Sequence, residues 1–362
     1  MPELQSYRRV LIVRLSAIGD VIRTLPAVNA WHQACPETRF TWLVEPAAAS
    51  VLRGHPALER VLVFERGRFA RPLRQPGALG RGLLSLTQLI AELRRAEFDL
   101  VVDFHGIFKS ALFSRLSGAG ARVGFGPGTA REGGHLFYTS HFQPSRPDLN
   151  RVDRALELVS FLGVPAPPEI AYRLPVGPEH RQRAGELLAG LEELPGRGPL
   201  IAIHPGSSPA TAYKRWHLNG YVGLINALVE KLGARIILTW GPGERETVEL
   251  LAGRVRVPRL VAGRTSSLLD LAAIFSLCDL YVGGDTGPMH LAAAVGTPVT
   301  AIFGPTHPGV NAPRGVPFRL VRHPLHCSPC RKRSCKSRLC LEAIGWPRVF
   351  AAAAELYRET SS

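Results

Sequence analysis

Residues able to do chemistry are densest in the segment 283–305, which reads GGDTGPMHLAAAVGTPVTAIFGP. An apolar strand ends there in two glycines, and Pro288 suits the first turn of a following helix. The N–H groups and the dipole of such a helix start bind anions, so the segment predicts a diphosphate site. Thr286 would add a hydroxyl donor, Asp285 would hold a sugar hydroxyl, and His290 would reach a phosphate or ribose. The alternative is that Asp285 and Thr286 merely cap the helix.

A second candidate phosphate site follows another apolar strand. The chain reads HPGSS at positions 204–208, and KRW begins at position 214. The hydroxyls of Ser207 and Ser208, with the amides of the glycine turn, can bind phosphate oxygens, and Lys214 would neutralise a departing diphosphate. Lysine is scarce in this chain, since 39 of the 44 basic residues are arginine, which argues against a general basic face built from lysine. A solvent-facing lysine is the alternative for Lys214.

The first loop of the chain places a carboxylate, Asp20, where a strand gives way to a helix. Residues 16–20 read SAIGD, with one glycine only, so the G-x-G-x-x-G pattern of a dinucleotide site is missing and a dehydrogenase is disfavoured. A carboxylate in this place can serve as a general base. An aspartate that caps the helix is the alternative reading.

These residues need strand ends to position them, and the apolar pattern supplies strands. Short apolar segments alternate with amphipathic helical segments, which predicts an α/β fold with mainly parallel, doubly wound sheets. The strand-like segments are 9–14, 40–45, 61–64, 99–106, 199–206, 234–243, 279–287 and 298–305. Loops at the carboxyl ends of such strands form ligand sites, so we expect two Rossmann-like domains facing across a cleft.

A proline-rich stretch interrupts this pattern in the middle of the chain and predicts a linker. We expect an N-terminal domain over 1–165, the linker over 166–176 and a second domain over 177–345. The remaining residues, 346–362, predict a C-terminal helix that packs back on the first domain.

The composition indicates a soluble protein with an acidic partner. The chain has 362 residues, 46% of them hydrophobic, and a formal charge of +15. No apolar run approaches the roughly 18 residues of a membrane span, and no signal peptide precedes the first strand. Basic residues gather in Arg66 to Arg95 and in Arg314 to Arg338. Nucleic acid, an anionic membrane surface or a phosphorylated substrate could bind these clusters. The alternative is that the arginine richness reflects a bias in codon usage.

Four of the six cysteines lie close together in a basic segment. Their spacing is C-x2-C-x4-C-x4-C, which resembles a metal site at the first pair but is compressed relative to common zinc sites. A bound metal, a local disulfide pair and reduced thiols all remain open, and zinc would be structural. The four are Cys327, Cys330, Cys335 and Cys340.

Taken together, these motifs resemble the ADP-heptose:lipopolysaccharide heptosyltransferases of glycosyltransferase family 9, in order and over nearly the whole chain. LIVRLSAIGDVIRTLPAV, HPGSS with KRW, and GGDTGPMHLAAAVGTPVTAIFGPTHP carry the resemblance. DFHGIFKSA at 103–111 and TARE at 129–132 are most similar to heptosyltransferase I, the branch that adds the first heptose. The cysteine cluster is a feature similar to heptosyltransferase II.

The resemblance implies a GT-B fold and an inverting, metal-independent transfer that requires no cofactor. The donor would be ADP-heptose, bound by the nucleotide-sugar-binding domain over 177–345. The acceptor would be the inner core of a lipopolysaccharide of the Kdo-lipid A type, bound by the acceptor-binding domain over 1–165. The enzyme would work in the cytoplasm, peripherally at the inner face of the inner membrane, with no nucleic acid as partner. Asp20 matches the family's catalytic base. The positions matching donor contacts are Ser207, Ser208, Lys214, Glu244, Asp285, Thr286, Gly287 and His290. The acceptor-side candidates are Arg66, Arg68, Lys109 and Arg131.

Two other functions compete with this one. The first is a family 9 glycosyltransferase with another nucleotide-sugar or another acceptor. The second, from a different class, is a basic nucleic-acid-binding protein that uses Arg314 to Arg338 and a cysteine-bound metal. That protein would need aromatic residues interleaved with its basic residues, which the tract lacks, and it would leave both Rossmann-like halves without a role.

Overall fold

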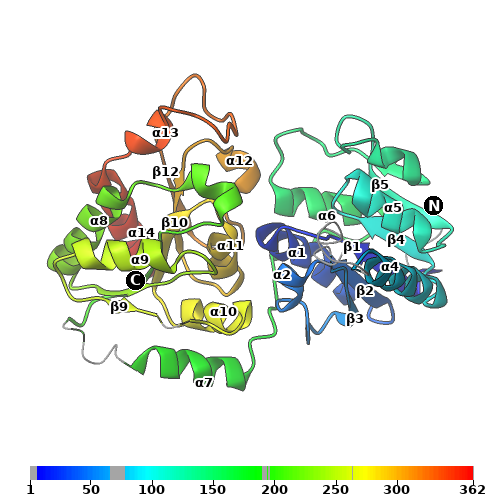
Figure 1. The fold of residues 1–362 in the computed structure, drawn as a ribbon, viewed down its shortest axis with the longest axis horizontal. Coiled ribbons are helices and arrows are strands. Elements are labelled where there is room, and N and C mark those ends of the chain that lie inside the picture. The colour runs from blue at the N-terminus through cyan, green and yellow to red at the C-terminus, as the bar shows by residue number, and fades with distance from the viewer. Residues whose placement is uncertain (1–5, 66–77, 190–193, 195, 263, 362) are drawn as a thin grey trace. The chain divides into compact units, whose positions relative to one another are not determined.

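The chain folds into two compact units, Met1–Pro175 and Val176–Ser362. A computed structural model describes residues 6–65, 78–189, 194, 196–262 and 264–361 (Figure 1). Each unit contains one six-stranded sheet with helices packed around it. The α/β fold with two doubly wound sheets is therefore confirmed.

The first unit is built on a wholly parallel sheet with the order β3-β2-β1-β4-β5-β6. Its strands are β1 (Arg9–Val13), β2 (Arg39–Val44), β3 (Leu58–Val63), β4 (Leu100–Asp103), β5 (Ala121–Phe125) and β6 (Ser140–Phe142). Its helices are α1 (Ile18–Ala34), α2 (Pro46–Ala49), α4 (Ala78–Arg95), α5 (Phe108–Leu116), the 3-10 turn η3 (Gly134–Phe137) and α6 (Arg151–Phe161).

The central strands of this sheet are apolar because helices cover both of their faces. All of β4 and all but the first residue of β1 are buried, as expected for parallel strands inside an α/β layer. Leu89 and Leu93 of α4 pack with Leu11 and Val13 of β1 in one hydrophobic core. Helix α4 is therefore a packing helix of this core.

The second unit repeats the arrangement with the order β12-β11-β10-β7-β8-β9, again wholly parallel. Its strands are β7 (Leu200–His204), β8 (Arg235–Leu238), β9 (Leu260–Val261), β10 (Leu280–Gly284), β11 (Val299–Phe303) and β12 (Phe318–Arg322). Its helices are α7 (Pro178–Leu187), the 3-10 turn η5 (Pro209–Lys214), α8 (Leu218–Leu232), α9 (Arg245–Arg254), α10 (Leu268–Ser276), α11 (Gly287–Ala294), α12 (Pro308–Asn311), α13 (Leu339–Glu342) and α14 (Trp346–Thr360).

The C-terminal helix α14 packs within the second unit. It contacts α8 and the strands β10, β11 and β12, and its residues Val349, Ala353 and Leu356 are buried in the core of that unit. Its expected return to the first domain stays a prediction. Among the described residues, none of the helices is both long and apolar enough to span a membrane.

Candidate functional site

In both sheets, the chemical residues follow the two strands at which the strand order reverses. In the first unit these are β1, which leads to Asp20, and β4, which leads to Lys109. In the second unit they are β7, which leads to the HPGSS loop, and β10, which leads to Asp285. Such a reversal leaves a crevice at the carboxyl ends of neighbouring strands, where doubly wound sheets bind ligands.

The start of α11 has the form of an anion site. Thr286 occupies the N-cap position, yet its side chain makes no capping hydrogen bond; the hydroxyl lies 3.4 Å from the carbonyl oxygen of Gly284. Pro288 lies in the first turn, as expected. The first-turn N–H groups therefore have no side-chain cap from Thr286, which leaves them suited to a ligand oxygen.

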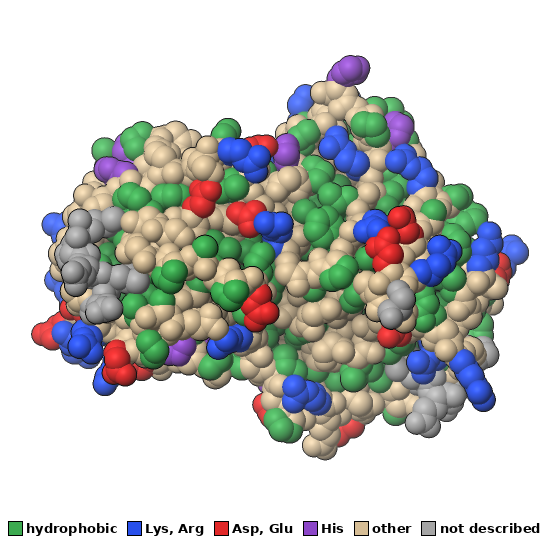
Figure 2. Space-filling view, turned by 180° about the vertical axis from the view of Figure 1, so that it is seen from behind, with side chains coloured by type: hydrophobic (Ala, Val, Ile, Leu, Met, Phe, Trp, Pro, Cys, Tyr) green, Lys and Arg blue, Asp and Glu red, His purple; other side chains and the backbone are tan. Residues whose placement is uncertain are grey.

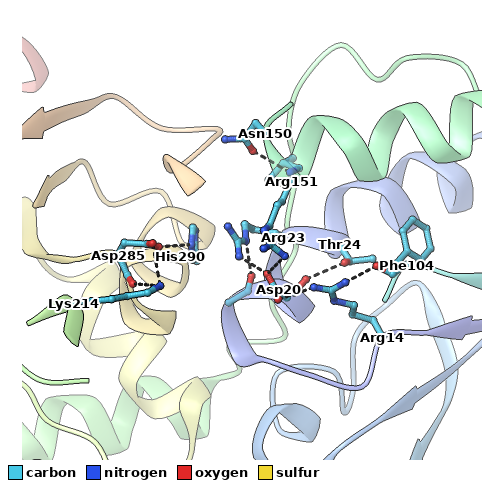
Figure 3. A network of polar contacts seen from close by, with 12 residues as sticks. Arg14, Asp20, Arg23, Thr24, Phe104, Asn150, Arg151, Lys214, Asp285 and His290 are labelled. Atoms are coloured by element: carbon cyan, nitrogen blue, oxygen red, sulfur yellow. Dashed lines mark hydrogen bonds and ion pairs between the residues drawn. The ribbon is translucent and has the colours of Figure 1, made fainter. Parts of the chain in front are cut away.

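Lys214 lies beside this helix start and joins two motifs that are 71 residues apart in sequence. Its Nζ is 3.0 Å from Oδ2 of Asp285 and 3.1 Å from the Asp285 carbonyl oxygen. The lysine side chain is 18% exposed and the aspartate side chain 5%. Nε2 of His290 lies 3.9 Å from Oδ1 of the same aspartate (Figure 3). The structure thus brings Lys214, Asp285 and His290 together, as the sequence predicts.

The two serines of the HPGSS loop are placed differently. Ser207 is buried, and its hydroxyl accepts a hydrogen bond of 3.1 Å from Nε of Arg215, which also binds the Ser207 carbonyl. Ser208 is exposed, and its hydroxyl is 3.0 Å from that of Thr211. Only Ser208 therefore presents its hydroxyl to solvent. Arg215 is a further polar residue of this loop and is not among the residues predicted from the sequence to form the site. The sequence feature that could have indicated it is its position directly after Lys214.

Glu244 is buried between two loops of the second unit. Its Oε2 accepts the Gly241 N–H at 2.8 Å and lies 3.0 Å from Nε2 of His204. Burial raises the pKa of this carboxyl, but the hydrogen bond and charge of His204 outweigh it, so the pKa lies below its ordinary value. A Cβ at Gly206 would stand 2.5 Å from Oε2, which explains the glycine. The Glu244 carboxylate therefore ties the loop after β7 to the loop after β8.

Asp20 lies at the third position of α1 and does not cap it. The N-cap is Ala17, and the Asp20 carboxylate instead forms ion pairs with three arginines. Nη2 of Arg14 is 2.6 Å from Oδ2, Nη1 of Arg151 is 3.2 Å from Oδ1, and Arg23 also contacts Oδ1 (Figure 3). The sequence did not point to these arginines, because they come from a strand end, the same helix and a helix far along the chain.

A second buried carboxylate, Asp103, ends strand β4. It accepts hydrogen bonds from the Tyr138 hydroxyl at 2.8 Å and from the backbone N–H groups of His105 and Gly106 at 2.7 and 3.1 Å. Burial raises the pKa of Asp103, and these hydrogen bonds oppose the rise. Asp103 therefore shapes the loop that carries His105 and Lys109.

His105 lies among the charges of the first unit. Its Nδ1 accepts the Leu15 N–H at 3.3 Å. Burial lowers its pKa to about 3, and the positive charge of Arg14 adds to the effect. The ring is therefore neutral at physiological pH, and its Nε2 carries the remaining proton.

The acceptor-side candidates are only partly described. Nζ of Lys109 is 2.5 Å from Oε1 of Glu45, so this lysine is ion-paired within the unit. Arg131 is exposed, and its backbone N–H donates to the Gly106 carbonyl at 2.8 Å, which places it beside the His105 loop. Arg66 and Arg68 lie outside the described residues.

The four clustered cysteines line one cavity of about 20 Å³ in the second unit. All four are free thiols. Burial and the charges of the other three raise the pKa of Cys340, whereas hydrogen bonds from the Arg338 backbone and from Ser337 lower that of Cys335. In the described part of the chain, no three His, Cys, Asp or Glu side chains are placed to hold a metal ion.

Comparisons with known proteins show the family of the chain. The model of glycosyltransferase family 9 (heptosyltransferase) matches residues 86–340. Lipopolysaccharide heptosyltransferase 1 of Pseudomonas aeruginosa is 30% identical over 332 residues, 90% of this chain and 87% of the relative. A family 9 glycosyltransferase from Veillonella parvula has the same fold, with a TM-score of 0.80, 21% identity and 98% of each chain covered. E. coli heptosyltransferase WaaC with ADP-2-deoxy-2-fluoro heptose gives a TM-score of 0.70 at 26% identity, covering 98% of this chain and 100% of that one.

Proposed function

This chain belongs to glycosyltransferase family 9, and from that premise we propose that it transfers a heptose from ADP-heptose to the inner core of a lipopolysaccharide precursor. The chain is a glycosyltransferase of the heptosyltransferase family. Its similarity to heptosyltransferase 1 over 90% of its length supports addition of the first heptose to a Kdo-lipid A type acceptor.

The observation that carries the proposal is the Lys214–Asp285 pair at the start of α11. A nucleotide-sugar presents a diphosphate, and a helix N-terminus beside a lysine is suited to bind it. When the glycosidic bond to the diphosphate breaks, negative charge grows on the leaving oxygen, and Lys214 stabilises it. In this proposal Thr286, Gly287 and His290 from the start of α11, with Ser208 from the loop after β7, complete the donor site.

Asp20 is the base in this proposal. It takes the proton of the acceptor hydroxyl as that oxygen bonds to the anomeric carbon from the side opposite the diphosphate. The bond from the anomeric carbon to the diphosphate breaks, and its electron pair leaves with ADP. This single displacement inverts the anomeric configuration. Lys214 and the helix start carry out the charge neutralisation, so we expect transfer to need no metal ion.

The acceptor half of the proposal rests on positive charge. Arg131 is exposed next to the His105 loop, and Arg66 and Arg68 precede α4 in sequence. Arginine forks suit the phosphates and carboxylates of an anionic glycolipid. Such an acceptor is anchored in a bilayer, so we propose that the protein works peripherally at the cytoplasmic face of the inner membrane.

The proposal is tested by incubating the purified protein with ADP-heptose and Kdo-lipid A and detecting the heptosylated product by mass spectrometry. A panel of other nucleotide-sugars, and an arm with a metal chelator, run in parallel. We expect product from ADP-heptose, unchanged by the chelator. Turnover with a different nucleotide-sugar, or binding of RNA with no turnover of any of them, would replace this function.

The Asp20→Asn variant tests the base. We expect transfer to fall about 10²- to 10⁴-fold, which is the usual cost of losing a general base, while calorimetry shows unchanged affinity for ADP. Asp148→Asn, an exposed aspartate of the same unit, is the control and should behave as wild type. Because the variant leaves three arginines around a neutral amide, thermal unfolding must show that it is folded. Transfer within a few-fold of wild type would remove Asp20 from the mechanism.

A further inference from the structure

The Asp20 carboxylate is enclosed by positive charge in a way that affects its use as a base. Oδ1 contacts both Arg23 and Arg151, while Oδ2 pairs with Arg14. A carboxylate oxygen has two lone pairs to offer to hydrogen-bond donors. With both guanidinium groups in place, Oδ1 has no position left for an incoming hydroxyl. A general base must come within hydrogen-bond distance of the proton it removes, so a hydroxyl that approaches Oδ1 requires one of its two arginine contacts to open.

The three arginines differ in how firmly they are held. The side chains of Arg14 and Arg23 are only 9% and 8% exposed. Each also donates to a backbone carbonyl, Arg14 to that of Phe104 and Arg23 to that of Gly19. These second hydrogen bonds keep both groups in place whether or not Asp20 engages them.

Arg151 is the exchangeable member of the three. Its side chain is 26% exposed, and its hydrogen bond to Oδ1 is the longest of the set at 3.2 Å. Within the described residues its Nε is buried without a hydrogen-bond partner, as is that of Arg14. Its backbone is fixed as the first residue of α6, where the Asn150 side chain caps the helix by accepting the Val152 N–H. The side chain can therefore change partner while the helix stays in place.

We propose that Arg151 is an acceptor-sensing positioning residue that controls access to Asp20. An oxyanion of the acceptor, a carboxylate or a phosphate, binds the Arg151 guanidinium in place of Oδ1. The acceptor hydroxyl then occupies the vacated position on Oδ1, transfers its proton there and attacks the anomeric carbon as the diphosphate departs. This inference rests on the proposed function and adds the step that readies its base.

The exchange is favourable in electrostatic terms. Arg151 exchanges its contact with the Asp20 carboxylate for a contact with the oxyanion of the acceptor. Bidentate guanidinium–oxyanion pairs are among the stronger hydrogen-bonded contacts. The acceptor shifts the equilibrium because it binds more tightly to the arrangement in which Arg151 has left Oδ1 of Asp20. Without an acidic acceptor, Oδ1 stays occupied and cannot activate water, so the nucleotide-sugar is protected from hydrolysis.

The test compares acceptors in wild type and in Arg151→Ala. One acceptor is the intact Kdo-lipid A, the second has its sugar carboxylates converted to methyl amides, and the third lacks the lipid phosphates. We expect wild type to lose at least tenfold in kcat/KM on one of the two neutralised acceptors, which identifies the oxyanion. Arg151→Ala should lose at least tenfold on the intact acceptor and show no further loss on that neutralised one. Arg151→Lys should recover part of the discrimination, because it keeps the charge without the fork.

A second readout separates this role from a structural one. Hydrolysis of ADP-heptose in the absence of acceptor should rise at least fivefold in Arg151→Ala, since Oδ1 then becomes available to water. Arg39→Ala, which removes an exposed arginine paired with Glu59, is the matched control and should leave both readouts unchanged. Thermal unfolding of each variant checks the fold, and Arg151→Gln replaces Arg151→Ala where the latter is unfolded.

The outcomes distinguish failure of the proposed function from failure of the proposed role of Arg151. If wild type makes no heptosylated product, the proposed function fails. If wild type is active and Asp20→Asn is not, but Arg151→Ala keeps the wild-type discrimination between acceptors, only this inference fails. A fall in acceptor-free hydrolysis in Arg151→Ala also overturns it.

Discussion

At the scale of single residues, the two carboxylates nearest the chemistry are held in different ways. Asp285 is paired with one lysine, which contacts both its side chain and its backbone carbonyl. Asp20 is paired with three arginines. Lys214 therefore contacts Asp285 at the start of α11, whereas the proposed role of Asp20 as a base requires one of its arginine contacts to open.

Lys214→Ala should both weaken binding of the donor and slow the transfer reaction. The lysine charge contributes to diphosphate binding, and its contribution grows as charge develops on the leaving group. We expect calorimetric titrations with ADP and ADP-heptose to show at least tenfold weaker binding, and kcat to fall as well. Lys231→Ala, a lysine of α8 that lies over the Trp346 and Phe350 rings, serves as control. Unchanged ADP affinity would move the donor site away from α11.

Tyr138→Phe tests the buried Asp103 network. The variant removes the hydroxyl that donates a hydrogen bond to Asp103. A buried carboxylate that lacks one hydrogen bond lowers the free energy of unfolding by about 1–3 kcal/mol. Burial already raises the pKa of Asp103, so the folded state favours its protonated form and loses stability as pH increases above the ordinary carboxyl range. Removing Tyr138 raises this pKa further. Urea denaturation should therefore show a larger loss at pH 8 than at pH 4, and an equal loss at both would contradict the assignment.

At the scale of elements, periodicity predicted the strands with continuous apolar runs and missed those without one. Four strands of each sheet follow from apolar runs, as in β1 and β7. The missed strands are β5, β6, β9 and β12. Of these, β9 has two residues and β6 three, and arginines interrupt both β5 (ARVGF) and β12 (FRLVR), so none shows a long continuous apolar run. Each becomes a strand because a neighbouring strand offers it backbone hydrogen bonds.

The candidate site also contains features that the sequence could predict and others that it could not. Motifs within one loop, such as the residues around Asp285, could be predicted because a strand end and a helix start are local features. Arg151 could not, because its contact with Asp20 spans 131 residues of sequence. Glu244 also shows the limit: the family resemblance implied a donor contact, which stays a prediction, and nothing in the sequence indicated that its carboxylate would contact Gly241 and His204.

Leu356→Ala tests the packing of α14 in the second unit. Leu356 is fully buried in the core formed with α8 and the sheet, and truncating such a leucine costs about 2–5 kcal/mol. Urea denaturation should show this loss. The control is Leu250→Ala in α9, where the side chain is 48% exposed and the expected change is within about 0.5 kcal/mol. A loss at Leu356 no larger than at Leu250 would mean that α14 is not part of this core.

At the scale of the whole molecule, the excess of positive charge is spread out. The sequence carries a formal charge of +15, yet on the face drawn in Figure 2 the Lys and Arg side chains are scattered among Asp and Glu. An anionic partner that binds such a surface is attracted by many weak, exposed contacts. These contacts are screened by salt, unlike an ion pair as enclosed as Lys214 with Asp285.

Salt should therefore weaken acceptor binding more than donor binding. The Debye length falls from ~10 Å at 0.1 M to ~3 Å at 1 M ionic strength, which removes most attraction between exposed charges. We expect the acceptor KM to rise with salt much more steeply than the donor KM. The double variant Arg66→Ala, Arg131→Ala should flatten the acceptor's response. If both substrates respond alike, or the double variant changes nothing, the acceptor binds elsewhere.

The repeated strand order has a consequence for how such a protein diversifies. Each sheet is complete in itself, and each carries its chemical residues on loops after its own two central strands. Substitutions in the loops of one unit leave the other unit's framework untouched, so recognition of the two substrates can drift independently during evolution. The chain passes from one unit to the other only once, at Pro175–Val176. Under the proposed division of the substrates between the units, a single recombination event at that position would exchange one substrate preference as an intact inherited block.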